Sequence, residues 1–269
     1  MELQDILLVS DIDGTLIDSQ YQIPPRNREA IQRFMEKGGG FSIATGRSWE
    51  SVLVCLGDLT VNRPCVLANG GLVYDLNRRQ AVSVQALPET AYTYTKRIME
   101  RFPHAGIEVF TPSDLWIVRE NDVTRQHLEN ERIGCRFGSI DSIQEPWCKM
   151  LVAMKEQPEL IAFTNSFCHE DVRFVASSDR YWEMLPKNVD KGTGLRELSK
   201  VCGCPIEYIA AIGDYDNDIE MLQIAGITAA PANASEKIRS MVDLTTCHCQ
   251  EGAVADFIEY LERMYEGRE

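Results

Sequence analysis

The sequence predicts an α/β fold in which a parallel sheet is flanked by helices and a second, α+β domain is inserted. Two observations support the sheet: short apolar runs alternate with helical patterns at the start of the chain, and the same alternation returns near its end. A third observation supports the insertion, because paired strand-like runs replace this alternation in the middle of the chain. The expected organisation is a core formed by residues 1–80 and 187–269 and an inserted domain formed by residues 81–186.

The first half of the predicted core contains three strands and two helices. A proline pair favours a helix start, and a glycine suits the left-handed residue that ends a helix. A continuous apolar run is typical of a strand that is buried on both faces of a parallel sheet. The expected elements are a strand at 6–10, a helix from Pro24-Pro25 to Gly38, a strand at 41–44, a helix from Ser48 to Leu56 and a strand at 65–68.

The second half of the core repeats this pattern after the insertion. The expected elements are a helix at 191–201, a strand at 208–212, a helix at 217–224, a strand at 227–230 and an amphipathic helix at 252–265. Within the inserted domain, two strand-like runs at 172–176 and 181–185 flank the turn-forming residues 177–180.

Composition excludes several classes of protein. The chain has 269 residues, of which 44% are hydrophobic and 25% charged, as is usual for a globular protein. A formal net charge of -14 without a Lys/Arg block argues against nucleic acid as a partner. No apolar stretch approaches the roughly 20 residues that cross a bilayer, and nothing resembles a signal peptide. Nine scattered cysteines indicate free thiols and therefore a cytoplasmic protein. Because no long apolar stretch is present, we expect no membrane partner. The sequence indicates no oligomeric state.

Polar residues follow three of the predicted strands directly. They are Asp11 and Asp13 after the first strand, Thr45-Gly46-Arg47 after the second, and Asp214 to Asp218 after the strand at 208–212. The carboxyl ends of parallel strands meet at one edge of a sheet, so we expect these side chains to converge. Crowded carboxylates need a cation, and oxygen ligands suit Mg²⁺. Each segment alone has the composition of an ordinary turn, so the prediction depends on their combination.

Together with Lys191, these segments resemble the four motifs of the haloacid dehalogenase (HAD) superfamily, in the same order. The matching segments are Asp11-Ile12-Asp13-Gly14-Thr15-Leu16, Thr45-Gly46-Arg47, Lys191-Gly192-Thr193-Gly194-Leu195 and Gly213-Asp214-Tyr215-Asp216-Asn217-Asp218. The insertion lies between the second and third motifs, which resembles the type-IIB cap of the Cof-like subfamily. This resemblance implies a Rossmann-like HAD core with a parallel sheet and an inserted C2B-type cap.

Other segments are also similar to that subfamily. They include Asn217 to Leu222 and Asn233-Ala234. Two positions depart from its usual pattern: Gly71 follows Asn69-Gly70 where alanine is common, and Pro231-Ala232 stand where Met-Gly is common. Neither departure falls on the residues that carry the chemistry.

The resemblance implies a Mg²⁺-dependent phosphatase that hydrolyses a small-molecule phosphate monoester through an aspartyl-phosphate. It assigns catalysis to Asp11 as nucleophile, Asp13 as general acid and base, and Lys191 as the cation that pairs with Asp11 and the phosphate. It assigns the metal to Asp11, the backbone carbonyl of Asp13 and Asp214, with Asp218 orienting those ligands and waters. The implied phosphate- and substrate-binding residues are Thr45, Gly46, Arg47, Lys191 and Asn217, although Arg47 has the alternative of a surface ion pair.

Two other functions stay open from the sequence. One is a phosphotransferase or mutase of the same superfamily, and the other is a non-catalytic protein that binds a phosphorylated metabolite. The motif residues recognise only the phosphoryl group, so we expect the inserted domain to act as a lid that selects the substrate, with sugar phosphates as the first choice by resemblance.

Further residues suggest alternatives that the sequence disfavours. The one-residue gaps of Cys202-Gly203-Cys204 and Cys247-His248-Cys249 are shorter than usual zinc-ligand spacing. We expect Trp116, Trp147 and Trp182 to pack in a core rather than stack on a ligand.

Overall fold

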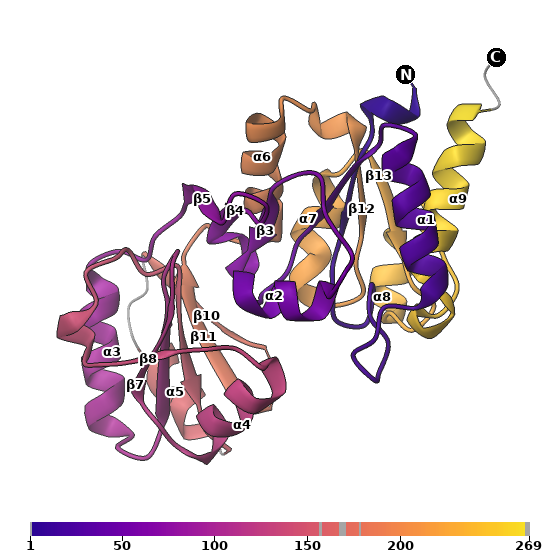
Figure 1. The fold of residues 1–269 in the computed structure, drawn as a ribbon. Helices are drawn as coiled ribbons and strands as arrows, with labels where there is room; N and C mark the ends of the chain where they lie inside the picture. The colour runs from indigo at the N-terminus through magenta and orange to yellow at the C-terminus, as the bar shows by residue number, and fades with distance from the viewer. Residues whose placement is uncertain (1, 156–157, 167–170, 178, 267–269) are drawn as a thin grey trace. The chain divides into compact units, whose positions relative to one another are not determined.

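The computed structural model describes residues 2–155, 158–166, 171–177 and 179–266. The chain divides into two compact units, which are described separately. The first consists of Met1–Ser83 and Asp190–Glu269, and the second of Val84–Val189. The first unit is therefore assembled from both ends of the chain (Figure 1).

The first unit is built on a five-stranded parallel sheet with the strand order β14-β13-β12-β1-β2. The strands are β1 (Leu7–Ser10), β2 (Gly40–Ile43), β12 (Ile209–Ile212), β13 (Ile227–Ala230) and β14 (Leu244–Thr245). Strand β1 is central, with Leu7 opposite Ile209 of β12 on one side and Gly40 of β2 on the other. All four of its residues are buried, as expected for an apolar run covered on both faces.

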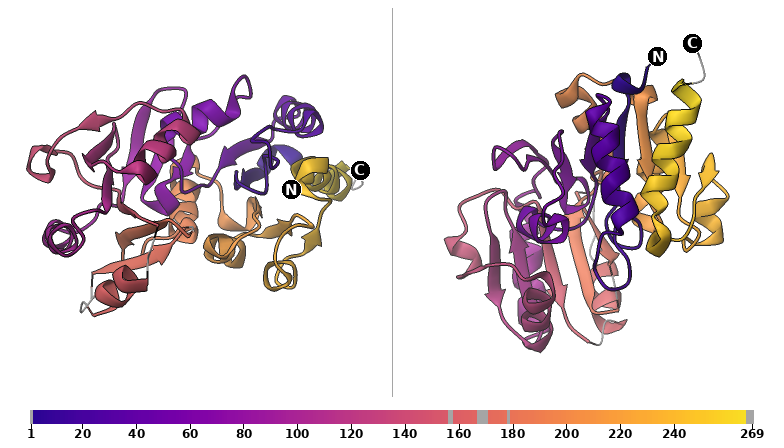
Figure 2. Two further views of the ribbon diagram at one scale, coloured as in Figure 1. Left: turned by 90° about the horizontal axis from the view of Figure 1, so that it is seen from below. Right: turned by 45° about the vertical axis from the view of Figure 1, so that its right-hand side comes forward.

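Helices cover both faces of this sheet. They are α1 (Pro25–Glu36), α2 (Trp49–Leu56), α6 (Lys191–Cys202), α7 (Ile219–Ile224), α8 (Glu236–Arg239) and α9 (Ala253–Glu266). Helices α1 and α9 lie side by side on one face (Figures 1 and 2), where Arg26 pairs with Asp256 and Arg33 with Glu262. On the other face, α6 and α7 contribute leucines and a methionine to a core cluster that contains Leu7 and Val9 of β1. The central strand is thus held between two helical layers.

The strand expected at 65–68 is present, but it belongs to a separate sheet and not to the parallel sheet. Strand β3 (Cys65–Leu67) pairs antiparallel with β4 (Leu72–Asp75), and β5 (Gln80–Val84) completes a separate three-stranded sheet. Its link to the parallel sheet is an isolated parallel bridge between Ala44 and Val66. The cause is a 3-10 turn at Ala68–Gly70, which reverses the chain after only three strand residues.

Two other differences concern short elements. The helix expected at 217–224 begins with a 3-10 turn at Asp216–Asp218 and becomes α-helical only at Ile219. Helix α8 and strand β14 are too short to produce a periodic pattern, so the sequence did not indicate them. Further 3-10 turns lie at Leu3–Asp5, Ile140–Ser142, Ile206–Tyr208 and Cys249–Glu251.

The second unit has a six-stranded sheet with the order β10-β11-β9-β6-β7-β8. Neighbouring strands are antiparallel except for the parallel pair β7 and β8. The elements are α3 (Thr90–Arg101), β6 (Gly106–Phe110), β7 (Leu115–Arg119), α4 (Asp122–Glu131), β8 (Arg136–Phe137), β9 (Lys149–Ala153), α5 (Pro158–Asn165), β10 (Val172–Ala176) and β11 (Tyr181–Pro186). The expected hairpin is β10 and β11; residue 178 of its turn lies outside the described residues.

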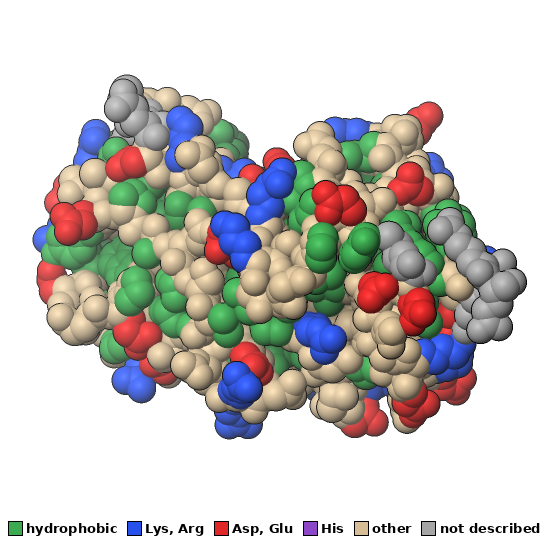
Figure 3. All heavy atoms as spheres, turned by 90° about the horizontal axis from the view of Figure 1, so that it is seen from above, with side chains coloured by type: hydrophobic (Ala, Val, Ile, Leu, Met, Phe, Trp, Pro, Cys, Tyr) green, Lys and Arg blue, Asp and Glu red, His purple; other side chains and the backbone are tan. Residues whose placement is uncertain are grey.

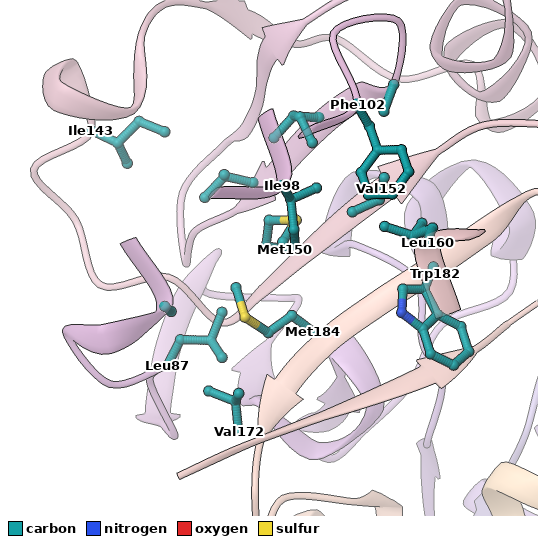
Figure 4. Close-up of a cluster of buried hydrophobic side chains, with 14 residues drawn as sticks. Leu87, Ile98, Phe102, Ile143, Met150, Val152, Leu160, Val172, Trp182 and Met184 are labelled. Carbon is teal, nitrogen blue, oxygen red and sulfur yellow. The ribbon is translucent and has the colours of Figure 1, made fainter. Parts of the chain in front are cut away.

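One face of this second sheet packs against α3 and α5 through a cluster of buried side chains (Figure 4). Trp182 belongs to the cluster, and its indole nitrogen donates a hydrogen bond to Thr164 Oγ1 at 3.0 Å. Trp116 and Trp147 are partly buried against the same cluster. The prediction that these three tryptophans pack in a core is confirmed.

The surface and the cysteines add two observations. On the face in Figure 3, Lys and Arg side chains lie in small separate groups among acidic and apolar ones. Eight of the nine cysteines are free thiols, and the ninth, Cys168, lies outside the described residues. Among the described residues, no helix is both long enough and apolar enough to cross a membrane.

Candidate active site

The parallel sheet brings loops that are distant in sequence to one edge. Asp11 directly follows β1, and its backbone N–H donates to the carbonyl of Ile212, the last residue of β12, at 2.9 Å. Asp214 follows that strand by two residues. Thr45 follows β2, and its N–H donates to the carbonyl of Val66 at 2.9 Å. Asp11, Asp214 and Thr45 therefore converge at the carboxyl ends of the strands, as predicted, and these backbone hydrogen bonds hold Asp11 and Thr45 there.

Lys191 links two of the gathered carboxylates. It is the first residue of α6, and the N-cap residue Asp190 accepts a hydrogen bond from the N–H of Thr193 at 2.7 Å. The Lys191 ammonium lies 2.6 Å from Asp11 Oδ1 and 2.6 Å from Asp218 Oδ1, and the residue is only 1% exposed. Burial by itself would lower the pKa of Lys191, but the two carboxylates outweigh it and raise that pKa above its ordinary value. Lys191 is therefore a fixed positive charge.

Asp218 is fully buried and uses both of its oxygen atoms within the protein. Its Oδ1 accepts from Lys191, and its Oδ2 accepts from the backbone N–H groups of Asp214 at 3.0 Å and Tyr215 at 3.1 Å. These bonds fix the course of the loop that carries Asp214. Asp218 thus holds both the Lys191 ammonium and the backbone at Asp214.

Asp214 is held close to the loop that follows β1. Thr15 Oγ1 donates to Asp214 Oδ1 at 3.1 Å. Gly14 has a φ of +81°, and a Cβ at this position would lie only 2.4 Å from Asp214 Oδ2. Glycine is therefore required there both for the backbone conformation and for the approach of the carboxylate.

Burial and mutual repulsion perturb the pKa values of the clustered carboxyls. Burial, followed by the negative charge of Asp218, raises the pKa of Asp214 to about 6. Burial also raises the pKa of Asp11 well above its ordinary value; Lys191 opposes this shift, and Asp218 and Asp214 add to it. The clustered carboxyls therefore favour the binding of a proton or of a further cation.

The donor set fits a hard divalent cation. Asp11, Asp214 and Asp218 each offer a carboxylate oxygen within 4.8 Å of the others. Of these, Asp11 Oδ2 and Asp214 Oδ2 accept no hydrogen bond from any part of the chain that the structure describes, whereas both oxygens of Asp218 are already engaged. Oxygen ligands of this kind suit Mg²⁺, so Asp11 and Asp214 are the side chains that would hold a metal.

Asp13 and Arg47 form an ion pair beside this cluster. Arg47 Nε donates to Asp13 Oδ2 and Nη2 donates to Asp13 Oδ1, both at 2.7 Å. Arg47 Nη1 also donates to Ser51 Oγ in the first turn of α2 at 2.7 Å. Of the two roles considered for Arg47, the structure contains the ion pair, and its partner is the expected general acid. The site contains four carboxylates, those of Asp11, Asp13, Asp214 and Asp218, and two cations, Lys191 and Arg47. Its formal charge is therefore -2.

The other predicted phosphate-binding residues are Thr45 and Gly46 after β2 and Asn217 in the 3-10 turn after β12. Thr45 is 1% exposed, and its hydroxyl accepts from the N–H of Arg47 at 3.3 Å. Asn217 is exposed, and its Nδ2 donates to Asn69 Oδ1 at 3.2 Å. A Cβ on Gly46 would lie 3.0 Å from Asn69 Nδ2. The four motifs assign no role to Asn69; its sequence signals were an Asn-Gly pair directly after a strand and the likeness of that pair to the subfamily pattern.

The parallel sheet brings carboxylates and a buried lysine together at its carboxyl edge, and an α+β cap is inserted in the chain. This fold and site are those of a Rossmann-like phosphatase of the HAD type. The chain belongs to the haloacid dehalogenase-like hydrolases, whose family model matches residues 8–258. Within this family it is a Cof-like phosphatase and therefore a phosphoric monoester hydrolase. Phosphatases of this class generally use a divalent metal, with which the aspartate cluster is compatible.

Individual relatives align over nearly the whole chain. Phosphatase YwpJ of Bacillus subtilis is 26% identical over 95% of this chain and 99% of its own. The 5-amino-6-(5-phospho-D-ribitylamino)uracil phosphatase YitU of the same organism is 26% identical over 96% of this chain and 98% of its own. The crystal structure of a haloacid dehalogenase-like hydrolase from Bacteroides thetaiotaomicron has a TM-score of 0.86 at 24% identity, covering 95% of this chain and 99% of that one, so this likeness concerns the fold.

Proposed function

We propose that the protein is a Mg²⁺-dependent phosphatase that hydrolyses a small-molecule phosphate monoester through an aspartyl-phosphate on Asp11. The observation that carries this proposal is the position of Lys191, whose ammonium lies 2.6 Å from the carboxylate of Asp11. A buried cation beside a nucleophilic carboxylate lowers the repulsion between that carboxylate and the negative oxygens of a phosphate. It also keeps Asp11 in one orientation, because Asp218 holds the same ammonium from the other side.

In the first step, a carboxylate oxygen of Asp11 attacks phosphorus while the bond from phosphorus to the ester oxygen breaks. The leaving oxygen takes the electron pair of that bond and receives a proton from Asp13. In the second step, a water oxygen attacks the aspartyl-phosphate, Asp13 accepts the proton of that water, and Asp11 leaves as a carboxylate. Phosphate and the free alcohol are the products.

The metal ligands would be the side chains of Asp11 and Asp214 and the backbone carbonyl of Asp13. When bound, Mg²⁺ supplies positive charge that offsets the phosphoryl oxygens and the crowded carboxylates. Asp218 keeps Asp214 in place through the backbone bonds already described. Support for this assignment comes from the formal charge of the site, which a single divalent cation would balance.

Thr45, the backbone at Gly46, Lys191 and Asn217 would bind the phosphoryl oxygens. Arg47, for which the sequence left substrate contact and an ion pair open, has its guanidinium engaged by Asp13. The ion pair holds Asp13 as a carboxylate, so Asp13 must release the guanidinium and take up a proton before it can protonate a leaving group. In this proposal, Arg47 therefore restrains the Asp13 carboxylate while the site is empty.

We assign catalysis to the core, predicted at residues 1–80 and 187–269, and substrate selection to the insertion, predicted at 81–186. The compact units of the structure change over between residues 83 and 84 and between 189 and 190. The substrate is a sugar phosphate or a related metabolite in this proposal. The name of the relative YitU specifies a phosphorylated ribitylaminouracil, so the substrate panel should extend beyond simple sugars.

The test is phosphate release from a panel of sugar, nucleotide and cofactor monoesters with Mg²⁺ and no added acceptor. Release of phosphate supports hydrolysis. Turnover that requires a second alcohol as acceptor would instead identify a phosphotransferase. Absence of turnover across the panel would leave a non-catalytic phosphometabolite-binding protein.

A further inference from the structure

A short turn beside the active site has an unusual backbone. Ala68, Asn69 and Gly70 have φ values of 51°, 54° and 100°, so three successive residues are left-handed. This region disfavours residues that carry a Cβ, and such conformations cluster at functional sites. Hydrogen bonds hold the turn in place: the N–H of Ala68 donates to the carbonyl of Arg47 at 3.3 Å, and that of Asn69 to the carbonyl of Thr45 at 3.0 Å. The strained turn is therefore tied to the loop that follows β2.

The same turn contacts the other two distant loops of the site. A Cβ on Gly70 would lie 2.0 Å from the carbonyl oxygen of Asp190, the residue that caps the helix of Lys191. Asn69 Oδ1 accepts a hydrogen bond from Asn217, which is 148 positions away in the sequence. One turn thus meets the loops that carry Thr45, Lys191 and Asn217.

The side chain of Asn69 lies at the centre of these contacts. The residue is 6% exposed. A Cβ on Gly46 would lie 3.0 Å from Asn69 Nδ2, 3.1 Å from Oδ1 and 3.2 Å from Cγ. The amide of Asn69 is therefore confined between Gly46 and Asn217, and only a glycine at position 46 leaves room for it.

We infer that Asn69 is a positioning residue that fixes the side-chain amide of Asn217 as a hydrogen-bond donor for the phosphoryl group. This inference rests on the proposed function. An asparagine amide can turn over and exchange its donor and acceptor ends. If Asn217 turned over, its carbonyl oxygen would face an anion and repel it. Asn69 Oδ1 favours the orientation in which the Asn217 nitrogen faces it and leaves the second N–H of that nitrogen available to a phosphate.

In the alternative explanation, Asn69 serves only to form the left-handed turn, and its side chain has no role. Asparagine is also tolerated in left-handed positions, where it could serve only to form the turn. Glycine adopts that conformation more readily than asparagine but has no side chain. Asn69→Gly therefore preserves the turn and removes the amide, whereas Asn69→Ala disturbs both.

The experiment is a double-mutant cycle with Asn69→Gly, Asn217→Ala and the combined variant. Thermal midpoints of all proteins are measured as a check on folding. Activity is measured as kcat and KM for the best ester of the panel. Binding of inorganic phosphate in the presence of Mg²⁺ is measured separately, as the rise in the thermal midpoint that phosphate produces.

We expect Asn69→Gly to lower kcat/KM by about tenfold to a hundredfold, the range for residues that orient a functional group, without lowering the thermal midpoint. The combined variant should be no worse than Asn217→Ala alone, because Asn69 acts through Asn217. Phosphate should stabilise Asn69→Gly less than the parent protein.

Two results would overturn the inference. Parent-like activity and phosphate binding in Asn69→Gly would show that the turn alone matters. Losses that multiply in the combined variant would show that Asn69 acts independently of Asn217. If the parent protein hydrolysed no ester, the proposed function would fail, and the same cycle on phosphate binding would decide the inference by itself.

Discussion

Arg47 holds both carboxylate oxygens of Asp13, with Nε 2.7 Å from Oδ2 and Nη2 2.7 Å from Oδ1. The two residues follow different strands, β2 and β1, and the Arg47 side chain is 11% exposed whereas that of Asp13 is 50% exposed. The guanidinium is further anchored by Ser51. A planar fork that matches both oxygens restrains the carboxylate in a way that a point charge cannot.

Arg47→Lys should therefore impair catalysis although the charge is kept. We expect kcat/KM to fall by about tenfold, because a lysine cannot hold both oxygens of Asp13, so the carboxylate that must become the proposed general acid loses its fixed position. In an Asp13→Asn background the same change should have little further effect. Steady-state kinetics of the four proteins test this, and a parent-like Arg47→Lys enzyme would contradict it.

Asp11→Asn should abolish turnover but not folding. The amide keeps the shape of the side chain and removes the attacking charge, so kcat should fall by at least ~10³-fold. The change also removes a buried charge that Asp214 and Asp218 repel, so the thermal midpoint of the metal-free protein should not fall. Kinetics combined with thermal melting measure both effects. Near-normal kcat in this variant would exclude the covalent route.

Metal removal should stop the reaction in a pH-dependent way. We expect chelation to abolish activity and Mg²⁺ to restore it. Because the pKa of Asp214 is raised to about 6, protons compete with the metal at low pH, and the rise in thermal midpoint that Mg²⁺ produces should be larger at about pH 7.5 than at about pH 5. Melting curves with and without Mg²⁺ at both pH values measure this difference.

The stability of the metal-free protein should fall with rising pH, whereas the stabilisation by Mg²⁺ should increase. A raised pKa means that the folded state binds the proton of Asp214 more tightly than the unfolded chain does, so stability falls as the pH rises from about 4 through about 6. An Mg²⁺ effect of equal size at both pH values, or full activity after chelation, would argue against Asp214 as a ligand.

A second pH effect is expected within the inserted unit. His127 Nδ1 lies 2.7 Å from Glu108 Oε2, and Glu108 is fully buried. Burial opposes the charge on His127, but the hydrogen bond and the charge of Glu108 outweigh it and raise the pKa of His127 above 6.5. The resulting stabilisation is complete below about pH 6.5 and is lost as the pH rises through the raised pKa.

Glu108→Gln keeps the shape of the side chain and removes this charge. We expect it to lower the free energy of unfolding by about 2 kcal/mol at pH 6 and by less at pH 8. Urea unfolding at the two pH values gives both differences. An equal loss in the free energy of unfolding at both pH values would indicate an effect of packing rather than of the charge of His127.

Substrate preference should follow the inserted unit. Replacing Val84–Val189, the bounds of the compact unit, with the corresponding segment of a relative should change the ranking of esters and leave the dependence on Mg²⁺ and Asp11 intact. The phosphate-release panel, run on the parent and the chimera, makes the comparison. An unchanged ranking in a folded, active chimera would locate specificity in the core loops, with Arg47 and Asn69 as the first residues to test.

Much of the core was predictable because its signals are local. The apolar run before Asp11 and the proline at the start of α1 each specify an element within a few residues. The strand at 65–68 keeps a parallel bridge to Ala44, but its antiparallel pairing with β4 was not predicted because that pairing depends on the turn at Ala68–Gly70. The Asn-Gly pair is a turn signal in the sequence, but the left-handed conformation of Ala68 is not visible there, because alanine rarely adopts it.

The sequence by itself determined which residue types follow the strands, and therefore predicted that the carboxylates and Thr45 meet at one edge of a parallel sheet; the resemblance of the motifs added Lys191. Only the tertiary structure decided the partners: Lys191 with Asp218 as well as Asp11, Arg47 with Asp13, and Asn69 with Asn217. The reason is physical. Strand order brings loops within reach of one another, but the direction of each side chain depends on loop dihedral angles and on neighbours far away in the chain, such as the Asp214 carboxylate that requires a glycine at position 14.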